Sequence, residues 1–168
     1  RVLNVLLPMM SAVAACELLQ PDVTGLRAID GLWSRSSSKE DIKPVKELRL
    51  AKVYEAAQHV KGTKQSSLLY EAAVIERTLG NTDNAAATIT AALVANPNNF
   101  QMRLVHIDLA LASGDTTTAK KEIDWCLLRR PDSQKLQGRI QRLKQLRIEQ
   151  ASMPTALNKS VGTPGARR

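Results

Sequence analysis

Apolar residues between positions 45 and 60 recur at the spacing of an α-helix. The segment contains neither glycine nor proline, and its apolar members fall on one helical face: Leu50, Val53, Tyr54 and Ala57. Pro44, which suits the first turn of a helix, precedes the segment, and Gly62 follows it. The pattern predicts a helix that starts just after Pro44 and ends before Gly62.

The segment from 66 to 133 repeats itself at a shift of 34 residues. The matched pairs are Gly80 and Gly114, Thr82 and Thr116, Ala85 and Ala119, Ile89 and Ile123, Leu93 and Leu127, and Pro97 and Pro131. A fixed period of this length is typical of solenoids, in which each repeat is one supersecondary unit stacked on its neighbours. The sequence therefore predicts two consecutive units, at 66–99 and 100–133.

Each type of matched residue has a physical role in a helix–turn–helix unit. A glycine can adopt the left-handed conformation that ends the first helix, an alanine is small where two helices touch, and a proline ends the second helix. These structural positions are Gly80, Ala85 and Pro97 in the first unit and Gly114, Ala119 and Pro131 in the second. Asn81 and Asp115 follow the glycines and carry side-chain oxygens that can cap the second helix. The predicted helices span 67–79, 83–95, 100–113 and 117–130.

The pattern resembles the tetratricopeptide repeat, and the resemblance covers both units. It implies an all-α solenoid of helix–turn–helix units, the alternative being an unrelated all-α bundle with the same spacing by coincidence. Two units bury too little surface to be stable alone. We therefore expect a helical domain over 44–150, in which the helix at 45–60 belongs to a degenerate upstream unit and residues 134–150 form a capping helix.

Residues 134–150 carry an apolar face and a basic face. The apolar face consists of Leu136, Ile140, Leu143 and Leu146. The basic residues around it are predicted to form one basic patch: Lys135, Arg139, Arg142, Lys144 and Arg147. Such a patch attracts an anionic surface such as lipid headgroups, nucleic acid or cell-wall polymer, or else it is the solvated side of the capping helix.

The resemblance also implies a place for a partner. In repeats of this type, a peptide or a helix binds on the concave face that the first helices line. The inward positions of that face would be Tyr70, Val74, Arg77, Leu104, Val105, Asp108 and Leu111. These residues either line a groove for a protein partner or serve in part as packing residues. The chain lacks the paired Lys and Asn with which chaperone-binding relatives hold a carboxylate, so we do not expect it to capture a free C-terminus.

An uncharged apolar run, Val2–Ala15, stands at the start of the chain and ends in small residues. Its 14 residues would span roughly 21 Å as a helix, less than the ~30 Å of a bilayer core, so residues 1–15 indicate a secretory signal. The sequence from Val13 to Cys16 resembles the lipobox of bacterial lipoproteins. This resemblance implies acylation at Cys16 and an outer-membrane lipoprotein that faces the periplasm. The alternatives are an ordinary signal cleaved near Ala15 and a cytoplasmic helix.

The segments on either side of the helical domain lack a sustained helical period. Residues 16–43 contain Pro21, Gly25, Gly31 and a run of three serines at 36–38, which predicts a flexible tether after the lipidated cysteine. Within it, a short amphipathic turn at 26–33 ends at Trp33, which we expect to dock on the domain. Residues 151–168 predict a disordered basic tail. Residues 133–168 hold eight basic residues and one acid, which is +7 of the formal net charge of +8.

Composition argues against several other classes of function. The chain has 168 residues, enough for one domain, and its 3% of aromatic residues are too few for a platform that stacks bases. Its two histidines and two cysteines form no dense cluster, so we expect no metal site, no disulfide framework and no cofactor. His59 and His106 lack a partner at a catalytic spacing, and Cys126 falls at a small, packed position. We expect no catalytic residue and no enzymatic activity.

The function that we expect is that of a membrane-anchored adaptor, which acts by binding a protein and has no small-molecule substrate. Anchor and repeats together indicate a component of a bacterial secretion, pilus or envelope-assembly apparatus. The first alternative is an accessory regulator of a cell-wall enzyme in the periplasm, and the second is a cytoplasmic protein associated with nucleic acid. The signal-like segment and the lack of aromatic residues among the basic ones argue against a nucleic-acid partner.

Overall fold

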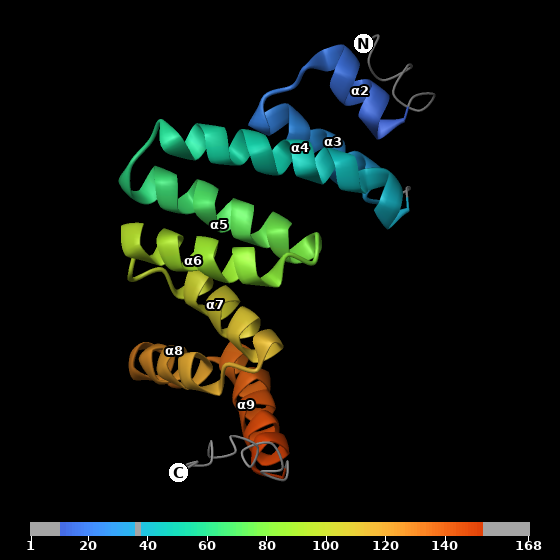
Figure 1. Cartoon of the computed structure of the whole chain (residues 1–168). Helices are drawn as coiled ribbons and strands as arrows, with labels where there is room; N and C mark the ends of the chain where they lie inside the picture. Colours follow the sequence, from blue (N-terminus) through green and yellow to red (C-terminus); the bar gives the residue numbers. More distant parts are fainter. Residues whose placement is uncertain (1–10, 36–37, 153–168) are drawn as a thin grey trace, which may run out of the picture.

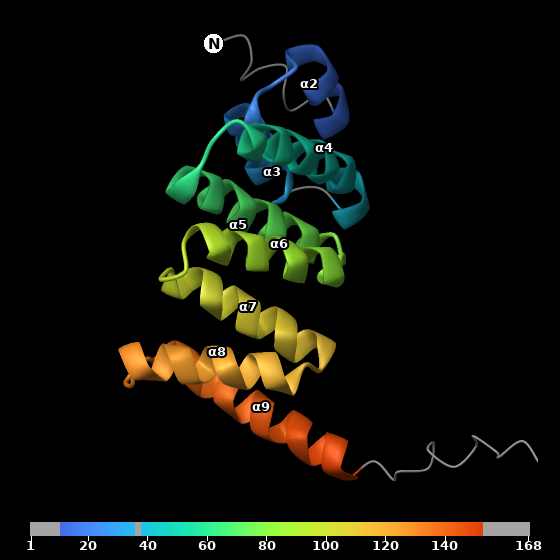
Figure 2. The same ribbon diagram turned by 60° about the vertical axis from the view of Figure 1, so that its left-hand side comes forward.

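The computed structural model describes residues 11–35 and 38–152, and these residues form helices and connecting turns without any strand. The helices are α2 (Ala12–Leu19), α3 (Val23–Trp33), α4 (Lys39–Gln58), α5 (Gly62–Thr78), α6 (Thr82–Ala95), α7 (Phe100–Ser113), α8 (Thr116–Arg129) and α9 (Gln134–Ser152). Each helix packs against the next one along the chain, and the stack runs from α2 at one end to α9 at the other (Figure 1, Figure 2). The predicted all-α solenoid is confirmed.

The two repeat units end their helices in the same way. Gly80 and Gly114 have φ angles of 85° and 76°, in the left-handed region that is open to glycine. Asn96 and Arg130 both leave the helical conformation, with φ near −146° and −145°. Each of them precedes a proline, whose ring disfavours the helical conformation of the residue before it. As a result α6 and α8 end at equivalent positions, and the chain turns into the next helix.

Helix capping differs between the units. Asp115 accepts hydrogen bonds from the backbone N–H groups of Thr117 and Thr118 at 3.1 and 3.0 Å, which caps α8. Asn81 stands at the same place before α6, but its side chain makes no capping hydrogen bond. The prediction that Asn81 caps its helix through its side chain is therefore wrong.

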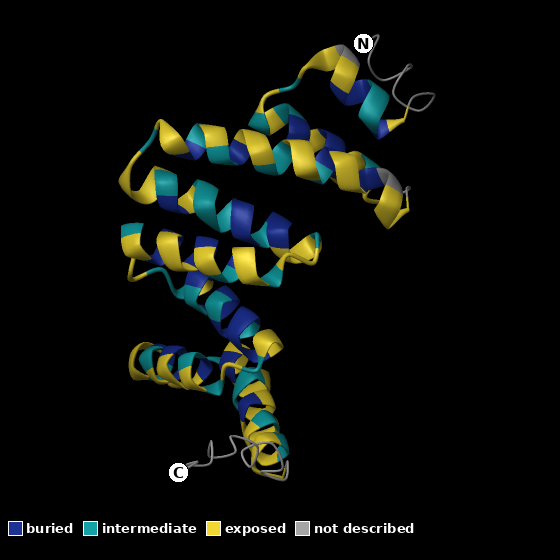
Figure 3. Cartoon of the chain, viewed as in Figure 1, coloured by how far each residue is buried: buried dark blue, intermediate teal, exposed yellow. Residues whose placement is uncertain are grey.

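Two apolar clusters hold the repeat units together, and α7 contributes to both. The first cluster joins α5, α6 and α7: Ala73, Ala85, Ile89, Ala92, Leu93, Met102, Val105 and Leu109. The second joins α7, α8 and α9: Leu104, Ile107, Ala110, Leu111, Ala119, Ile123, Cys126, Leu136 and Leu143. Ala85 and Ala119 are both 0% exposed. Because α7 packs on both sides, most of it is buried or half-buried (Figure 3).

The region before α5 differs from the prediction of a flexible tether at 16–43. In their described part, residues 16–43 form the second half of α2, all of α3 and the first turn of α4. Residues from all three helices bury their side chains in one apolar cluster: Ala12, Cys16, Leu26, Ile29, Ile42 and Val45. Trp33 packs against this cluster, as expected. The prediction of a coil was wrong because the apolar residues of α3 find partners in α2 and α4, and tertiary packing outweighs a weak local pattern.

An early start to α4 is a second departure. The helix begins at Lys39, so Pro44 lies inside it and not in its first turn. The predicted helix at 45–60 is therefore only the later part of a longer element, which ends at Gln58.

Charged side chains connect α3, α4 and α5. Arg49 of α4 pairs with Asp30 of α3 at 2.6 Å and with Glu71 of α5 at 2.8 Å. Arg27 of α3 pairs with the same Glu71. The N-terminal helices are thus joined to the repeat units through one shared carboxylate, and also through a buried apolar cluster of Val53 on α4 with Ala72 and Ile75 on α5.

Two predicted segments fall largely beyond the described residues. Of the signal segment at 1–15, only 11–15 are described, and residues 153–168 of the predicted tail are not described. Across residues 11–35 and 38–152, no helix combines the length and the hydropathy needed to cross a membrane.

Candidate protein-binding groove

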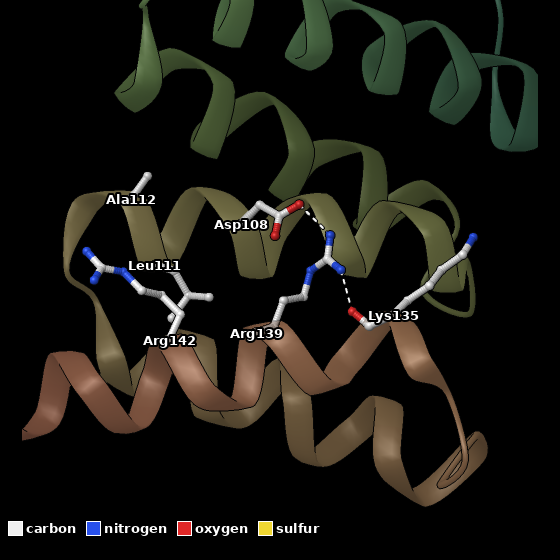
Figure 4. Close-up of a pocket in the computed structure, with 7 residues that line it drawn as sticks. Asp108, Leu111, Ala112, Lys135, Arg139 and Arg142 are labelled. Atoms are coloured by element: carbon white, nitrogen blue, oxygen red, sulfur yellow. Dashed lines mark hydrogen bonds and ion pairs between the residues drawn. The ribbon is translucent and has the colours of Figure 1, made fainter.

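A groove of about 510 Å³ lies between α7 and α9. Its lining residues are Asp108, Leu111, Ala112, Lys135, Gly138, Arg139 and Arg142 (Figure 4). Helix α7 is the first helix of the second repeat unit. Helix α9 comes directly after that unit, in the place where the first helix of a third repeat unit would lie. The groove therefore lies between two consecutive first helices, which contact each other directly.

Packing of α9 fixes which of its residues face α7. Leu136 and Leu143 are buried in the cluster with α7 and α8, so they set the rotation of α9 about its axis. Lys135, Arg139 and Arg142 are spaced by four and three residues, which places them on one helical face. That face lines the groove.

The predicted five-residue basic patch is not one surface. Lys144 is nine residues from Lys135, which at 3.6 residues per turn is about 180° around the helix. Lys144 and Arg147 are exposed, and neither lines the groove. The prediction of a single patch is wrong because the basic residues surround the apolar face on both of its sides.

Asp108 is the electrostatic centre of the groove. Its Oδ2 atom accepts a hydrogen bond from Nη2 of Arg139 at 2.6 Å and lies 3.9 Å from Nη1 of Arg77 on α5. Arg139 also donates to the backbone carbonyl of Lys135. Figure 4 shows Asp108 and Arg139 directed toward each other across the space between the two helices.

The remaining donors around Asp108 have few acceptors. Nε of Arg139 is buried and has no hydrogen-bond partner among the described residues. The only acid that Arg142 approaches within the described part of the chain is Glu149, at 4.0 Å. The groove thus combines a surplus of cationic donors with the apolar side chains of Leu111 and Ala112.

Three of the seven residues predicted to line the groove are packing residues. Leu104, Val105 and Leu111 are only 1%, 5% and 7% exposed. Leu104 and Val105 line no part of the groove, and Leu111 contributes only a small accessible edge. The prediction of Leu104 and Val105 as a free partner surface is wrong because α7 lies between two apolar clusters and uses its apolar residues for both.

Of the other four predicted residues, Asp108 lines the groove and Arg77 pairs with Asp108, whereas Tyr70 and Val74 do not line the groove. Tyr70 packs partly against the cluster of α5, α6 and α7, and Val74 is half-buried. Arg77 is exposed and Asp108 is half-buried. The ion pair of Arg77 with Asp108 brings two predicted residues together.

Sequence reasoning treated the groove and the basic helix as separate sites, but the structure places them side by side. The signal was present in the 34-residue frame. A shift of the predicted positions Leu104, Val105 and Asp108 by 34 residues leads to Gly138, Arg139 and Arg142. All three line the groove.

A second polar cluster lies between α7 and α8. Arg103 pairs with Glu122 and stacks on the ring of Trp125 at 3.9 Å, while Arg129 covers the same ring at 3.7 Å. His106 Nδ1 lies 3.5 Å from Glu122 Oε1. Burial alone would raise the pKa of Glu122, but the neighbouring His106 and Arg103 side chains hold that pKa below its usual range. This cluster joins the two helices of the unit.

The two cysteines are both buried. Cys126 lies in the cluster of α7, α8 and α9, where burial raises the pKa of its thiol. Cys16, the predicted lipidation residue, lies in α2 with 6% of its surface exposed, and burial together with the nearby Glu17 raises its thiol pKa as well. Among residues 11–35 and 38–152, no group of three or more His, Cys, Asp or Glu side chains is arranged to hold a metal ion.

Comparisons of the chain with protein-family models, with curated proteins and with solved structures found no match. What the protein does is therefore inferred from its own residues.

Proposed function

We propose that this protein is an adaptor that binds a protein partner on the first-helix face of a tetratricopeptide-like solenoid. The observation that carries the proposal is the groove between α7 and α9, where exposed cations adjoin the apolar Leu111 and Ala112. Solenoids present such surfaces to extended peptides and to partner helices. The 34-residue frame, with its matched glycine, alanine and proline positions, supports the choice of this family of repeats.

The setting that we propose is the bacterial cell envelope, where the adaptor would serve a secretion, pilus or envelope-assembly apparatus. The support for this setting is the lipobox-like run from Val13 to Cys16. Cleavage before Cys16 would remove Ala12–Ala15, which are half of α2, and acylation would require an accessible thiol. An anchored form would therefore differ from the structure of the full chain in α2. Binding through the groove does not depend on this anchor, because the groove lies at the far end of the stack (Figure 1).

A site-specific crosslinking experiment tests the adaptor function. A photoreactive amino acid replaces Ala112, an exposed residue that lines the groove, in the full chain made by its own organism. The matched control is the same replacement at Ala91, an exposed alanine of α6. We expect a discrete protein adduct from position 112 that is missing from position 91.

The identity of the adduct then distinguishes the two envelope functions. A structural component of an assembly apparatus supports the adaptor, and a cell-wall enzyme supports an accessory regulator. If position 112 yields no adduct, or the same adducts as position 91, the groove is not the binding surface and the proposal fails.

A further inference from the structure

The groove between α7 and α9 carries an excess of positive charge. Lys135, Arg139 and Arg142 line it, and Arg77 reaches its single described acid, Asp108, from α5. These four cations and one acid have a formal charge of +3. A neutral or basic segment that covered them would leave cations desolvated without partners, which is costly. Charge complementarity therefore favours a segment that supplies carboxylates.

Asp108 occupies the position that a carboxylate of such a segment would take. It accepts a hydrogen bond from Arg139 at 2.6 Å, and within the described part of the chain no other acid pairs with that guanidinium. A guanidinium can bind one carboxylate through two parallel N–H donors. Nη1 and Nη2 of Arg139 already donate to Lys135 and Asp108, and its Nε is buried, so a carboxylate of the segment would bind this guanidinium by taking the place of Asp108.

Space for a side chain adjoins these donors. Leu111 and Ala112 are three and four residues after Asp108, so they share its face of α7. On the opposite wall, Gly138 has no side chain, and a Cβ atom built there would meet nothing within 4 Å. The groove thus has room for an apolar side chain beside its cations.

We propose that the groove binds an acidic peptide segment of a partner protein. One carboxylate of the segment replaces Asp108 on Arg139, a second pairs with Arg142 or Lys135, and an adjacent apolar side chain covers Leu111 and Ala112. This inference rests on the proposed adaptor function and specifies the chemistry of its partner.

Two other occupants fit the groove less well. An anionic membrane is flat, and Lys144 faces about 180° away from Lys135, so one bilayer surface does not meet the basic residues of α9 together. The chain's own C-terminal residues carry Lys159, Arg167 and Arg168, which have the wrong sign. A peptide segment can instead enter between α7 and α9.

Selection from a random twelve-residue peptide library, with the full chain as bait, tests the inference. We expect the enriched peptides to be rich in Asp and Glu with a neighbouring apolar residue, and we expect the Arg139→Gln variant to lose this enrichment. Enriched peptides without acids would overturn the acidic-partner inference and leave the adaptor function standing. No enrichment together with no adduct at position 112 would overturn both.

Fluorescence anisotropy with the best acidic peptide then distinguishes groove binding from general attraction. Arg139→Gln should weaken binding by about tenfold, because a hydrogen-bonded charge pair is lost, and Lys144→Gln, which removes the same charge elsewhere on α9, should change it by less than about twofold. Asp108→Asn should strengthen binding, because the internal competitor for Arg139 is removed. Equal losses for Arg139→Gln and Lys144→Gln, or weaker binding by Asp108→Asn, would contradict the inference.

Two substitutions of Gly138 test the groove without changing its charge, in case the charge variants lose their fold. Gly138→Trp should block the groove while all its charges remain, and Gly138→Ala should bind the peptide normally, since its Cβ atom meets nothing. Circular dichroism melts check that each variant is folded.

Vesicles of phosphatidylglycerol and phosphatidylcholine replace the peptide in a final experiment. If they bind and Arg139→Gln and Gly138→Trp abolish that binding as well, the ligand is an anionic surface and the peptide inference is wrong.

Discussion

The repeat units, α5 to α9, and the N-terminal helices, α2 to α4, both have apolar cores, but their contacts are distributed differently along the sequence. In the repeat units, small and apolar residues at fixed intervals pack the helices together, and Ala85 and Ala119 are fully buried at equivalent positions. The N-terminal helices form a smaller apolar cluster, and they connect to α5 through the shared carboxylate of Glu71 and through the apolar contacts of Val53 with Ala72 and Ile75. The partners of Glu71, Arg49 and Arg27, lie 22 and 44 positions away in the sequence.

This difference explains why a periodic pattern is visible in one region and hidden in the other. In a repeat unit, each residue type recurs because the same contact recurs, so the frame can be read along the chain. In the N-terminal region, each contact occurs once and joins distant positions. The following variants test this contrast, from the largest expected effect to the smallest.

Replacement of Leu104 should produce the largest effect. Leu104→Ala removes a side chain that is 1% exposed between α7, α8 and α9, and we expect a loss of about 3 kcal/mol in the free energy of unfolding. Leu128→Ala in α8 is the matched control, because Leu128 is 83% exposed and its loss should change stability by less than about 0.5 kcal/mol. Urea unfolding followed by circular dichroism measures both values. If the Leu104→Ala variant is as stable as the control, Leu104 is not a packing residue, and its prediction as part of the partner surface would stand.

Overpacking of the helix contact inside a unit should have the next largest effect. Ala85→Leu adds atoms where α5 and α6 touch, and we expect a loss of about 2 kcal/mol, since a packed contact accommodates new methyl groups only through strain. Ala87→Leu, at an exposed position of the same helix, should remain within about 0.5 kcal/mol of the parent. Thermal and urea unfolding compare the two variants. If both behave like the parent, Ala85 is not at a close helix contact.

Neutralisation of Glu71 tests the N-terminal connection through its pH dependence. Burial alone would raise the pKa of Glu71, but hydrogen bonds from Arg27 and Arg49 hold that pKa below the ordinary value of 4.5. A carboxyl with a lowered pKa stabilises the folded state above its unfolded pKa, and this stabilisation is lost as the pH falls through the folded pKa. Glu71→Gln should therefore cost about 1.5 kcal/mol at pH 7, and the difference from the parent should shrink below about pH 4.5.

The exposed Glu47 supplies the control for this pH series. Glu47→Gln removes the same charge from α4, where its nearest cation lies 3.8 Å away, and should alter stability by less than about 0.5 kcal/mol at pH 7. Unfolding free energies from urea titrations at pH 7, 5, 4 and 3 measure both variants against the parent. A gap between Glu71→Gln and the parent that stays constant with pH would show that packing of the side chain, not its charge, joins α3 and α4 to α5.

Much of the fold of the repeat units could be predicted from the sequence. The glycines, alanines and prolines that recur at 34 residues act locally, through backbone conformation and helix contacts, so their roles follow from residue type and spacing. The predicted helices at 83–95 and 117–130 differ from α6 and α8 by a single residue at their ends. The full helix at 23–33, of which the sequence predicts only a short turn, and the early start of α4 at 39–44 could not be predicted in this way, because their stability comes from a cluster that joins three helices.

The candidate site could be predicted only in part. Asp108 and Arg139 were each identified, on separate grounds, but their pairing depends on the rotation of α9, which Leu136 and Leu143 set by packing. The resemblance to the repeat family implies that Leu104 and Val105 belong to a partner surface, and the helical period of α7 does not show whether one of its faces is buried or two. That distinction requires knowledge of what covers each side of α7.

Cys16 offers the smallest expected change in stability and the sharpest test of the N-terminal region. The thiol is buried among apolar side chains from α2, α3 and α4, so Cys16→Ser places a hydroxyl in that cluster and should cost about 1 kcal/mol in the full chain. Cys126→Ser, which changes the other buried cysteine, is the matched control for loss of a thiol.

If Cys16 is an acylation site, only Cys16→Ser also removes a lipid. Mass spectrometry and incorporation of a palmitate analogue detect that loss. An unchanged mass and equal membrane retention of Cys16→Ser and the parent would make Cys16 a packing residue alone. In that case α2 is not cleaved and remains part of the solenoid. The two regions then differ in how their helices pack, and no proteolytic processing distinguishes them.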